Sequence, residues 1–288
     1  MSKTIFITGA SSGIGQQAAL LFQRNGWNVV ASMRSPEQDQ VLAGLPNVIC
    51  PVLDVTDDAS IDHAVAEALA RFGQIDVVLN NAGYGLIGAF ETFDKAQIER
   101  QFQTNVFGLM AVTRALLPHM RQRRAGTIVN VTSFAGRSIF PVYSVYHASK
   151  WAVEGFSESL QYELREYNLR VKIIEPGIVK TAFWGRSTDR HNRSGIHAYD
   201  SYGEPVLDLI DNAAALIATQ PEDVANIIWR AANDGSSRLR YVVGLDAHVT
   251  LGIRKVLSDS AYTQVMTGFF SQSSQRLFQK ILSRLTNA

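Results

Sequence analysis

The sequence predicts an α/β fold: a doubly wound, seven-stranded parallel sheet with helices on both faces. Short apolar runs alternate with helical stretches along most of the chain. The runs are nearly continuous in Val and Ile, as at 75–80 and 170–176, which is typical of strands buried on both faces. Helical stretches of ten or more residues separate most of the runs, as the crossovers between parallel strands require.

Seven apolar runs give the predicted strands. In chain order they are KTIFIT (3–8), WNVVAS (27–32), NVICPVLDV (47–55), IDVVLN (75–80), GTIVNVTS (126–133), RVKIIEP (170–176) and RYVVG (240–244). Gly-rich punctuation follows the first run at once, as expected at the end of a strand.

Helical periodicity fills the intervals between these runs. Helices are expected at about 13–25, where Gly26 gives a stop signal, and then at 36–43, 59–72, 94–122, 144–167, 205–218 and 221–234. Residues 245–288 are expected to form a largely helical C-terminal extension. We expect residues 1–288 to be a single domain, because doubly wound sheets often run past ~250 residues as one unit.

Composition and charge exclude several classes of protein. Lys and Arg number 27 against 26 Asp and Glu, so no basic excess exists for binding nucleic acid. A hydrophobic content of 46% is typical of a folded globular chain. No apolar run approaches the ~18 residues of a spanning helix. The lone Cys50 and the short apolar run at 5–7 fit a cytoplasmic protein without a signal peptide.

A glycine-rich turn lies between the first strand and the first helix, in the order Thr8-Gly9-Ala10-Ser11-Ser12-Gly13-Ile14-Gly15. Glycine permits a tight turn and lets the backbone approach a pyrophosphate without a Cβ in the way. The N-terminus of the following helix offers free N–H groups and the positive end of its dipole to an anion. This position in a βαβ unit therefore indicates a dinucleotide site.

Further motifs follow the glycine turn, whose spacing is Gly-x-x-x-Gly-x-Gly. Asn80-Asn81-Ala82-Gly83 comes after the fourth strand, Asn105 lies in the long helix after it, Ser133 ends the fifth strand, Tyr146-x-x-x-Lys150 opens the next helix, and Pro176-Gly177 follows the sixth strand. Over about residues 3–181 the chain resembles the short-chain dehydrogenase/reductase (SDR) family, in its compact single-domain branch. The resemblance implies a Rossmann-type NAD(P)-binding domain and an oxidoreductase that transfers hydride between a nicotinamide cofactor and a carbonyl or secondary alcohol.

The residues themselves support acid–base chemistry. Tyr146 and Lys150 are i and i+4 and so share one face of a helix, although such pairs also occur by chance. A phenol with a pKa near ~10 is a poor base at neutral pH, and a neighbouring ammonium would favour the phenolate. Tyr146 would then be a usable general acid/base. Ser133, at the carboxyl end of a central strand, could donate to a carbonyl oxygen that gains negative charge, or it could cap a turn.

The resemblance assigns roles to these residues. It implies that Tyr146 transfers the proton, that Ser133 orients the substrate oxygen, and that Lys150 tunes Tyr146 and holds the nicotinamide ribose. Asn105 would support a proton relay through water, unless it is a mid-helix residue that bonds locally. Asp54 would flank the adenine, unless it makes a turn or caps the next helix. The other implied cofactor contacts are Gly9, Ser11, Ser12, Gly13, Ile14, Gly15, Val55, Asn81, Ala82, Gly83, Pro176, Gly177, Val179 and Thr181.

The second strand favours NADP(H) over NAD(H). An NAD site usually places an acid ~20 residues beyond the glycine turn, where it accepts from the ribose 2′-hydroxyl. Here the strand ends in ASMR (31–34), with no acid before Glu37. Arg34 can instead bind a 2′-phosphate in a fork, and the hydroxyls of Ser11 or Ser12 can add donors. The alternative is a solvated arginine at the end of a strand.

No metal site is predicted. The histidines show no ligand spacing with Cys50 or with a carboxylate. His147, inside the Tyr-x-x-x-Lys motif, is expected to be a variable helix position and not a base.

Residues 181–204 are polar, Gly-punctuated and interleaved with Phe183, Trp184, Tyr199 and Tyr202. A long irregular stretch in a compact domain is often functional, so we expect a substrate lid at about 183–218, with a mobile surface loop as the alternative. Apolar residues also follow Ser133 and the Asn-Asn-Ala-Gly turn. We therefore expect a largely apolar carbonyl or alcohol as substrate.

Two other functions stay open: a catalytically silent NADP(H)-binding redox sensor, and an epimerase or dehydratase of the same superfamily. The intact Ser133, Tyr146 and Lys150 argue against the sensor, and the lack of a separate substrate domain argues against the second. The resemblance implies a homodimer or homotetramer that pairs through the helices near 94–122 and 144–167. The amphipathic helix that follows 268 is expected to pack on its own domain or on a second subunit and not on a membrane.

Overall fold

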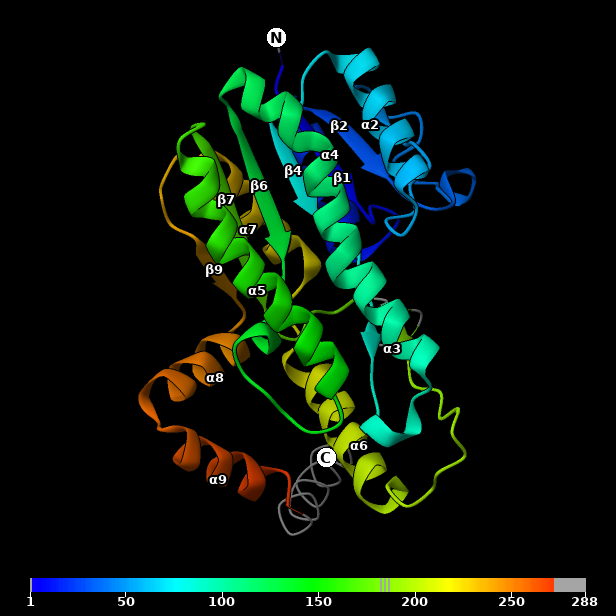
Figure 1. Cartoon of the computed structure of the whole chain (residues 1–288), viewed down its shortest axis with the longest axis vertical. Helices are drawn as coiled ribbons and strands as arrows, with labels where there is room; N and C mark the ends of the chain where they lie inside the picture. The colour runs from blue at the N-terminus through cyan, green and yellow to red at the C-terminus, as the bar shows by residue number, and fades with distance from the viewer. Residues whose placement is uncertain (1, 182, 184, 186, 272–288) are drawn as a thin grey trace, which may run out of the picture.

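Seven parallel strands form the central sheet, which confirms the predicted fold (Figure 1). The computed structural model describes residues 2–181, 183, 185 and 187–271. The strand order is β3-β2-β1-β4-β6-β7-β9. The strands are β1 (Thr4–Thr8), β2 (Asn28–Ser32), β3 (Val48–Ile49), β4 (Val77–Asn80), β6 (Gly126–Val131), β7 (Leu169–Pro176) and β9 (Arg240–Val243). The order reverses between β1 and β4, which is where ligands bind in open α/β sheets.

Helices cover both faces of the sheet because successive strand residues point to opposite sides. On β1, Ile5 and Ile7 join an apolar cluster with α1 and α7, whereas Phe6 joins a second cluster with α2, α4 and α5. The helices are α1 (Gly13–Arg24), α2 (Asp58–Phe72), α3 (Lys95–Phe102), α4 (Gly108–Arg123), α5 (Ser144–Arg165), α6 (Asp200–Ile217), α7 (Pro221–Asn233), α8 (Leu245–Val256) and α9 (Asp259–Phe269).

A buried pair of amides joins the two central strands. Asn80 on β4 and Asn130 on β6 are register partners, and Asn80 Nδ2 donates to Asn130 Oδ1 at 2.9 Å. Asn80 Nδ2 also donates to Thr113 Oγ1 on α4 at 2.9 Å, and Asn130 Nδ2 donates to Ser157 Oγ on α5 at 2.8 Å. The pair therefore ties β4 and β6 to the helices that cover them.

The helix predicted at 94–122 is interrupted. The π-helical turn Gln103–Phe107 separates α3 from α4. A π-turn inserts one residue without any compositional signature, so the hydrophobic period does not reveal it. A Cβ on Gly108 would lie 2.6 Å from the carbonyl oxygen of Val55, so α4 begins in close contact with the loop after β3.

Two predictions near the second strand hold only in part. Of residues 36–43, only Pro36–Gln38 form a short 3-10 turn. The carboxylate of Asp39 then accepts the backbone N–H groups of Leu42 and Ala43 at 2.8 and 2.6 Å and so replaces helical bonds. The strand predicted at 47–55 is limited to β3 and an isolated bridge at Val52, since Pro51 has no N–H to donate to a ladder.

The described part of residues 181–204, which were predicted to be irregular, contains regular secondary structure. Two short strands, β5 (Gly85–Leu86) and β8 (Thr188–Asp189), form a second parallel sheet. The α6 helix begins at Asp200, five residues before the predicted start, and Pro205 lies inside it. Arg190 makes two 2.8 Å hydrogen bonds to Asp211 of α6.

The C-terminal extension contains α8 and α9, as predicted. Phe270 is buried in the cluster that contains Tyr146, which agrees with packing of this end on its own domain. The rest of the amphipathic helix predicted after 268, from residue 272 on, lies outside the described residues. Among the helices that are described, none is long and apolar enough to cross a membrane.

Candidate active site

A cavity of about 940 Å³ runs from the glycine turn, along the carboxyl ends of the central strands, to α9. It brings together nearly all of the predicted site residues. Those that line it are Gly9, Ser11, Ser12, Gly13, Ile14, Arg34, Asp54, Val55, Asn81, Ala82, Gly83, Ser133, Tyr146, Lys150, Pro176, Gly177, Val179 and Thr181. Gly15 and Asn105 lie behind its wall.

The glycine turn packs closely on the segment after β4. A Cβ on Gly9, whose φ is +67°, would lie 2.9 Å from Cα of Ala82, and one on Gly15 would lie 2.5 Å from Asn81 Nδ2. Asn81 Nδ2 donates to the carbonyls of Thr8 and Gly9 at 3.0 Å each. Glycine is therefore needed here for contacts within the protein, in addition to the approach of a phosphate that the sequence argument invoked.

The first turn of α1 fits the phosphates of a dinucleotide. Ser12 precedes the helix in extended conformation, and its side chain makes no hydrogen bond to the helix. Arg34 follows β2, is exposed and lines the same end of the cavity as Ser11 and Ser12. Within the described part of the chain, no hydrogen bond or ion pair engages its guanidinium. Free helix N–H groups beside an unpaired arginine suit an anionic group.

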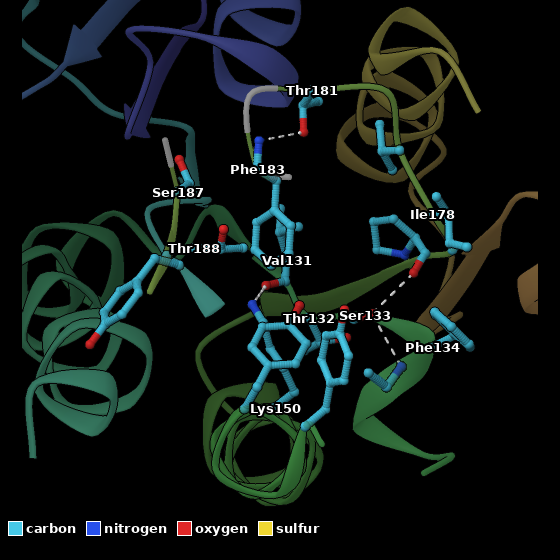
Figure 2. A pocket seen from close by; sticks show the side chains of 18 of the residues that line it. Val131, Thr132, Ser133, Phe134, Lys150, Ile178, Thr181, Phe183, Ser187 and Thr188 are labelled. Atoms are coloured by element: carbon cyan, nitrogen blue, oxygen red, sulfur yellow. Dashed lines mark hydrogen bonds between the residues drawn. The ribbon is translucent and has the colours of Figure 1, made fainter. Parts of the chain in front are cut away.

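Three of the four predicted catalytic side chains, those of Ser133, Tyr146 and Lys150, line this cavity. Figure 2 shows Ser133 and Lys150 among the side chains that line it. Lys150 Nζ donates to the carbonyl of Val131 at 3.1 Å and lies 5.8 Å from the ring centroid of Tyr146. Ser133 Oγ accepts from the N–H of Ala135 at 3.1 Å and donates to the carbonyl of Pro176 at 3.3 Å. The capping alternative for Ser133 is thus correct, and the same hydroxyl also lines the cavity.

Burial is the largest cause of the pKa shifts of Tyr146 and Lys150. It raises the pKa of Tyr146 to about 12, although a hydrogen bond with Ser133 lowers it in part. Burial also lowers the pKa of Lys150 to about 8, against the charge of Glu154, which raises it. The sequence pointed to a lowered pKa for Tyr146, but in this structure burial raises it. At neutral pH the site presents a protonated phenol beside an ammonium, and that phenol is a proton donor.

Asn105 and Asp54 form local hydrogen bonds, which were the alternative to the roles that the family resemblance implies for them. Asn105 is buried, with Oδ1 accepting from the N–H of Tyr84 at 3.0 Å and Nδ2 donating to its carbonyl at 2.8 Å. Asp54 Oδ1 accepts from the N–H and hydroxyl of Thr56 at 2.9 and 2.8 Å, which is a turn; the cap of α2 is Asp57. Asn105 therefore holds the backbone beside Gly83, and Asp54 shapes the loop that lines the cavity.

His147 has a more definite place than a variable helix position. Its Nδ1 lies 2.7 Å from the carbonyl of Ala135, and its Nε2 accepts from the N–H of Phe140 at 3.2 Å, so Nδ1 carries the proton. Burial lowers its pKa to about 4. The neutral imidazole of His147 is thus hydrogen-bonded to Ala135 and Phe140, at both ends of the loop that follows Ser133. Among the described residues, no group of three or more His, Cys, Asp or Glu could hold a metal ion.

Sequence reasoning missed two walls of the cavity. Arg100 on α3 pairs with Asp189 on β8 and donates from Nε to the hydroxyl of Tyr84 at 3.3 Å. The other wall consists of apolar residues on α8 and α9, together with those on α6, which lies within the predicted lid. The apolar period of those helices can be seen in the sequence. Which face of each helix turns toward the cavity depends on contacts between distant elements, and so could not be predicted.

Relatives of this chain are oxidoreductases by name. The short chain dehydrogenase family model matches residues 3–192. An uncharacterized oxidoreductase of Schizosaccharomyces pombe is 37% identical over 233 residues, which cover 80% of this chain and 96% of that protein. The uncharacterized oxidoreductase YusZ of Bacillus subtilis is 35% identical over 276 residues, 92% of this chain and 97% of that one. A 3-ketodihydrosphingosine reductase of Bacteroides thetaiotaomicron is 37% identical over 190 residues, 66% and 67% of the two chains.

Solved structures match as well. A short-chain dehydrogenase from Streptomyces avermitilis has a TM-score of 0.80 and 34% identity, over 93% of this chain and 96% of that one. ElxO with NADP bound has a TM-score of 0.71 and 27% identity, over 86% and 98%. A 3-ketoacyl-(acyl-carrier-protein) reductase from Brucella melitensis, complexed with NADH, has a TM-score of 0.71 and 25% identity, over 84% and 96%. Because the family model spans well over half of the chain, and named oxidoreductases match most of its length, the chain belongs to the short-chain dehydrogenase/reductase family and is an NAD(P)-dependent oxidoreductase.

Proposed function

We propose that the protein interconverts a largely apolar carbonyl compound and its alcohol, with NADP(H) as the preferred cofactor and Tyr146 as the general acid/base. The observation that carries this proposal is the meeting of Ser133, Tyr146 and Lys150, all buried, in the wall of a single cavity. The relative named as a 3-ketodihydrosphingosine reductase supports a ketone as the group that is reduced.

The chain's own residues divide the chemistry among them. The cofactor, when bound, supplies or takes up the hydride. Ser133 gives up its bond to the carbonyl of Pro176 and donates to the substrate oxygen, where negative charge develops. Tyr146 then donates its phenolic proton to that oxygen. Lys150 holds a positive charge beside the phenolate that remains. Asn105 fixes the backbone of Tyr84 beside Gly83, which lines the cavity.

The preference for NADP(H) rests on Arg34. Relatives bind either cofactor, since ElxO holds NADP and the Brucella enzyme holds NADH. The residues at the end of β2 must therefore decide. There the chain offers an exposed arginine beside two serine hydroxyls and no carboxylate that could accept from a ribose 2′-hydroxyl.

Aromatic side chains around Tyr146 support an apolar substrate and a lid over it. The rings of Phe134 and Phe140 stack with their centroids 5.6 Å apart, and the ring centroids of Phe183 and Tyr146 are 5.8 Å apart. We assign residues 183–218 as a lid that excludes water from the hydride path. Trp184 and Arg186 lie outside the described residues. Proteolysis within 183–204 should slow when NADPH and a substrate analogue are both present, and equal cutting with and without them would count against the lid.

Tyr146→Phe tests the function directly, and Tyr143→Phe is a matched control. Both phenols are buried and line the same cavity, yet the hydroxyl of Tyr143 has no hydrogen-bond partner within the described residues. Tyr146→Phe should lower kcat for carbonyl reduction by about 10²- to 10⁴-fold while Kd for NADPH, measured by fluorescence, stays within about twofold. Tyr143→Phe should keep most activity. Wild-type turnover in Tyr146→Phe would refute the assignment.

We also propose that the protein is a homodimer or homotetramer that pairs through α4 and α5. Tyr162 is 68% exposed on α5, and Trp151 on the same helix and Phe107, just before α4, are also exposed. Exposed aromatic side chains on α5 and just before α4 suit an interface.

A further inference from the structure

An apolar channel extends the cavity beyond Tyr146, between three helices at the carboxyl ends of the strands. We call it the tail channel and define it by Ile217 of α6, Val249 and Ile253 of α8, and Val265, Met266 and Phe269 of α9. Two pairs of these, Val249 with Ile253 and Val265 with Phe269, are i and i+4 and so lie on one face of a helix. Both α8 and α9 therefore turn an apolar face toward the cavity. Figure 1 shows these two helices and α6 at the same end of the molecule.

Burial changes along the tail channel. At its inner end Leu209, Ile210 and Phe270 are buried in the same cluster as Tyr146. Elsewhere along the channel, Ile217 and Phe269 are 53% and 55% exposed. An apolar surface thus continues from the catalytic tyrosine to solvent. Large apolar side chains that stay half exposed along one cavity wall indicate a surface made to be covered by a ligand.

We propose that the substrate carries a long unbranched alkyl chain, which lies in the tail channel while its carbonyl oxygen meets Ser133 and Tyr146. This inference rests on the proposed function and names the class of substrate for the same site. Within the described residues, α6, α8 and α9 contribute no basic side chain to the cavity, and their polar contributions are Asp246, Thr250 and Tyr262. The channel therefore suits an uncharged hydrocarbon and offers no cation for an anionic tail.

A series of unbranched aldehydes and 2-ketones, from about four to sixteen carbons, tests the proposal with NADPH and with NADH as cofactor. Each methylene buried in the channel should raise kcat/KM about fourfold, and the rise should level off once the alkyl chain fills the channel. Turnover without any dependence on chain length would overturn the inference and leave the proposed function intact, as when another segment or a second copy fills the channel. No turnover of any carbonyl with either cofactor would instead overturn the proposed function.

Three substitutions on α8 test whether the chain-length dependence of kcat/KM arises in the tail channel. Val249→Asn and Ile253→Asn place an amide on the channel wall and should flatten the chain-length dependence. Val256→Asn is the matched control, because Val256 is 82% exposed on the same helix and does not line the cavity. Thermal unfolding should be similar for all three, since these side chains are at least 40% exposed. A steep dependence that survives in Val249→Asn and Ile253→Asn, or that is lost equally in Val256→Asn, would refute the tail channel.

Discussion

The phenyl ring of Phe183 lies against the phenol of Tyr146, with ring centroids 5.8 Å apart and planes at 57°. A Cβ on Gly85 would meet the same phenyl ring at 2.9 Å. Phe183 is thus held between β5 and the catalytic tyrosine. A residue of the proposed lid therefore helps to bury the group whose pKa burial raises.

Phe183→Ala should lower the pKa of Tyr146, because water would reach the phenol and stabilise its charged form. The pH profile of kcat/KM for alcohol oxidation, which needs the phenolate, should shift to lower pH. Phe90→Ala, at a side chain 62% exposed on the surface, is the control and should leave the profile in place. An unchanged profile in Phe183→Ala would contradict the role of the ring in burial.

Arg34→Ala should weaken the use of NADPH. The loss of a charged hydrogen-bonded contact to the 2′-phosphate should reduce kcat/KM for NADPH by about 10- to 100-fold, and kcat/KM for NADH should hardly change. Arg24→Ala removes an exposed arginine at the end of α1, away from the cavity, and serves as the control. Wild-type efficiency that favours NADH, and that Arg34→Ala leaves unaltered, would refute the assignment.

Glu154 should set the pH at which reduction declines. It lies one turn beyond Lys150 on α5, accepts from Thr132 Oγ1 at 2.6 Å and pairs with Arg240 at 3.0 Å. Its charge raises the pKa of Lys150, which burial lowers to about 8. The ammonium is lost as pH rises through this value, so kcat/KM for reduction should fall above about pH 8.

Glu154→Gln removes that negative charge and should move the decline in reduction to lower pH. Glu158→Gln is matched to it, because Glu158 also pairs with Arg240 but lies a turn further from Lys150 and is 52% exposed. Steady-state rates between about pH 6 and pH 10 measure both variants. Equal shifts in the two would show that Arg240, and not the charge of Glu154, controls the profile.

His147 should make the protein sensitive to acid. Burial lowers its pKa from 6.5 to about 4. As pH falls through this interval, the unfolded chain takes up a proton that the folded chain does not. The free energy of unfolding should therefore fall by about 3 kcal/mol from this group alone. Urea unfolding between pH 7 and pH 4 should show a shallower loss for His147→Asn than for the wild type. His63→Asn, at an exposed position on α2, should match the wild type.

Light scattering at micromolar concentration should give two or four times the chain mass of 31.7 kDa. Tyr162→Asp puts a charge on the exposed face of α5 and should shift the protein toward monomer, because an unpaired charge is costly in an interface. Tyr167→Asp, just beyond the end of α5, should leave the assembly unchanged. A wild-type monomer would rule out pairing through α4 and α5.

Local sequence predicts those parts of the molecule that local interactions determine. The strand at 75–80 and the helix at 144–167 lie close to β4 and α5, because a continuous apolar run and a long helical period have few alternatives. The motif residues of the glycine turn, and Ser133, Tyr146 and Lys150, reach the cavity for the same reason. Each belongs to a strand end or a helix start whose position the sheet fixes.

Features that depend on distant contacts could not be predicted in this way. Asp189 meets Arg100 across 89 positions of sequence, and nothing near either residue indicates the other. The raised pKa of Tyr146 depends on how deeply the folded chain covers it, whereas the spacing to Lys150 suggested the opposite direction. The π-turn around Asn105 leaves no mark in composition.

The amide pair of Asn80 and Asn130 has a consequence for how the sheet assembles. If β6 paired with β4 one residue out of step, every side chain of β6 would change face. Asn130 would lose its hydrogen bonds to Asn80 and Ser157, and each buried amide left without a partner would reduce stability by about 1–3 kcal/mol. Ser133 would also be displaced by about 3.3 Å along the strand. Misaligned sheets are therefore penalised during folding, and the separation between the Asn81–Gly83 turn and Ser133 is set once the sheet forms, before any ligand binds.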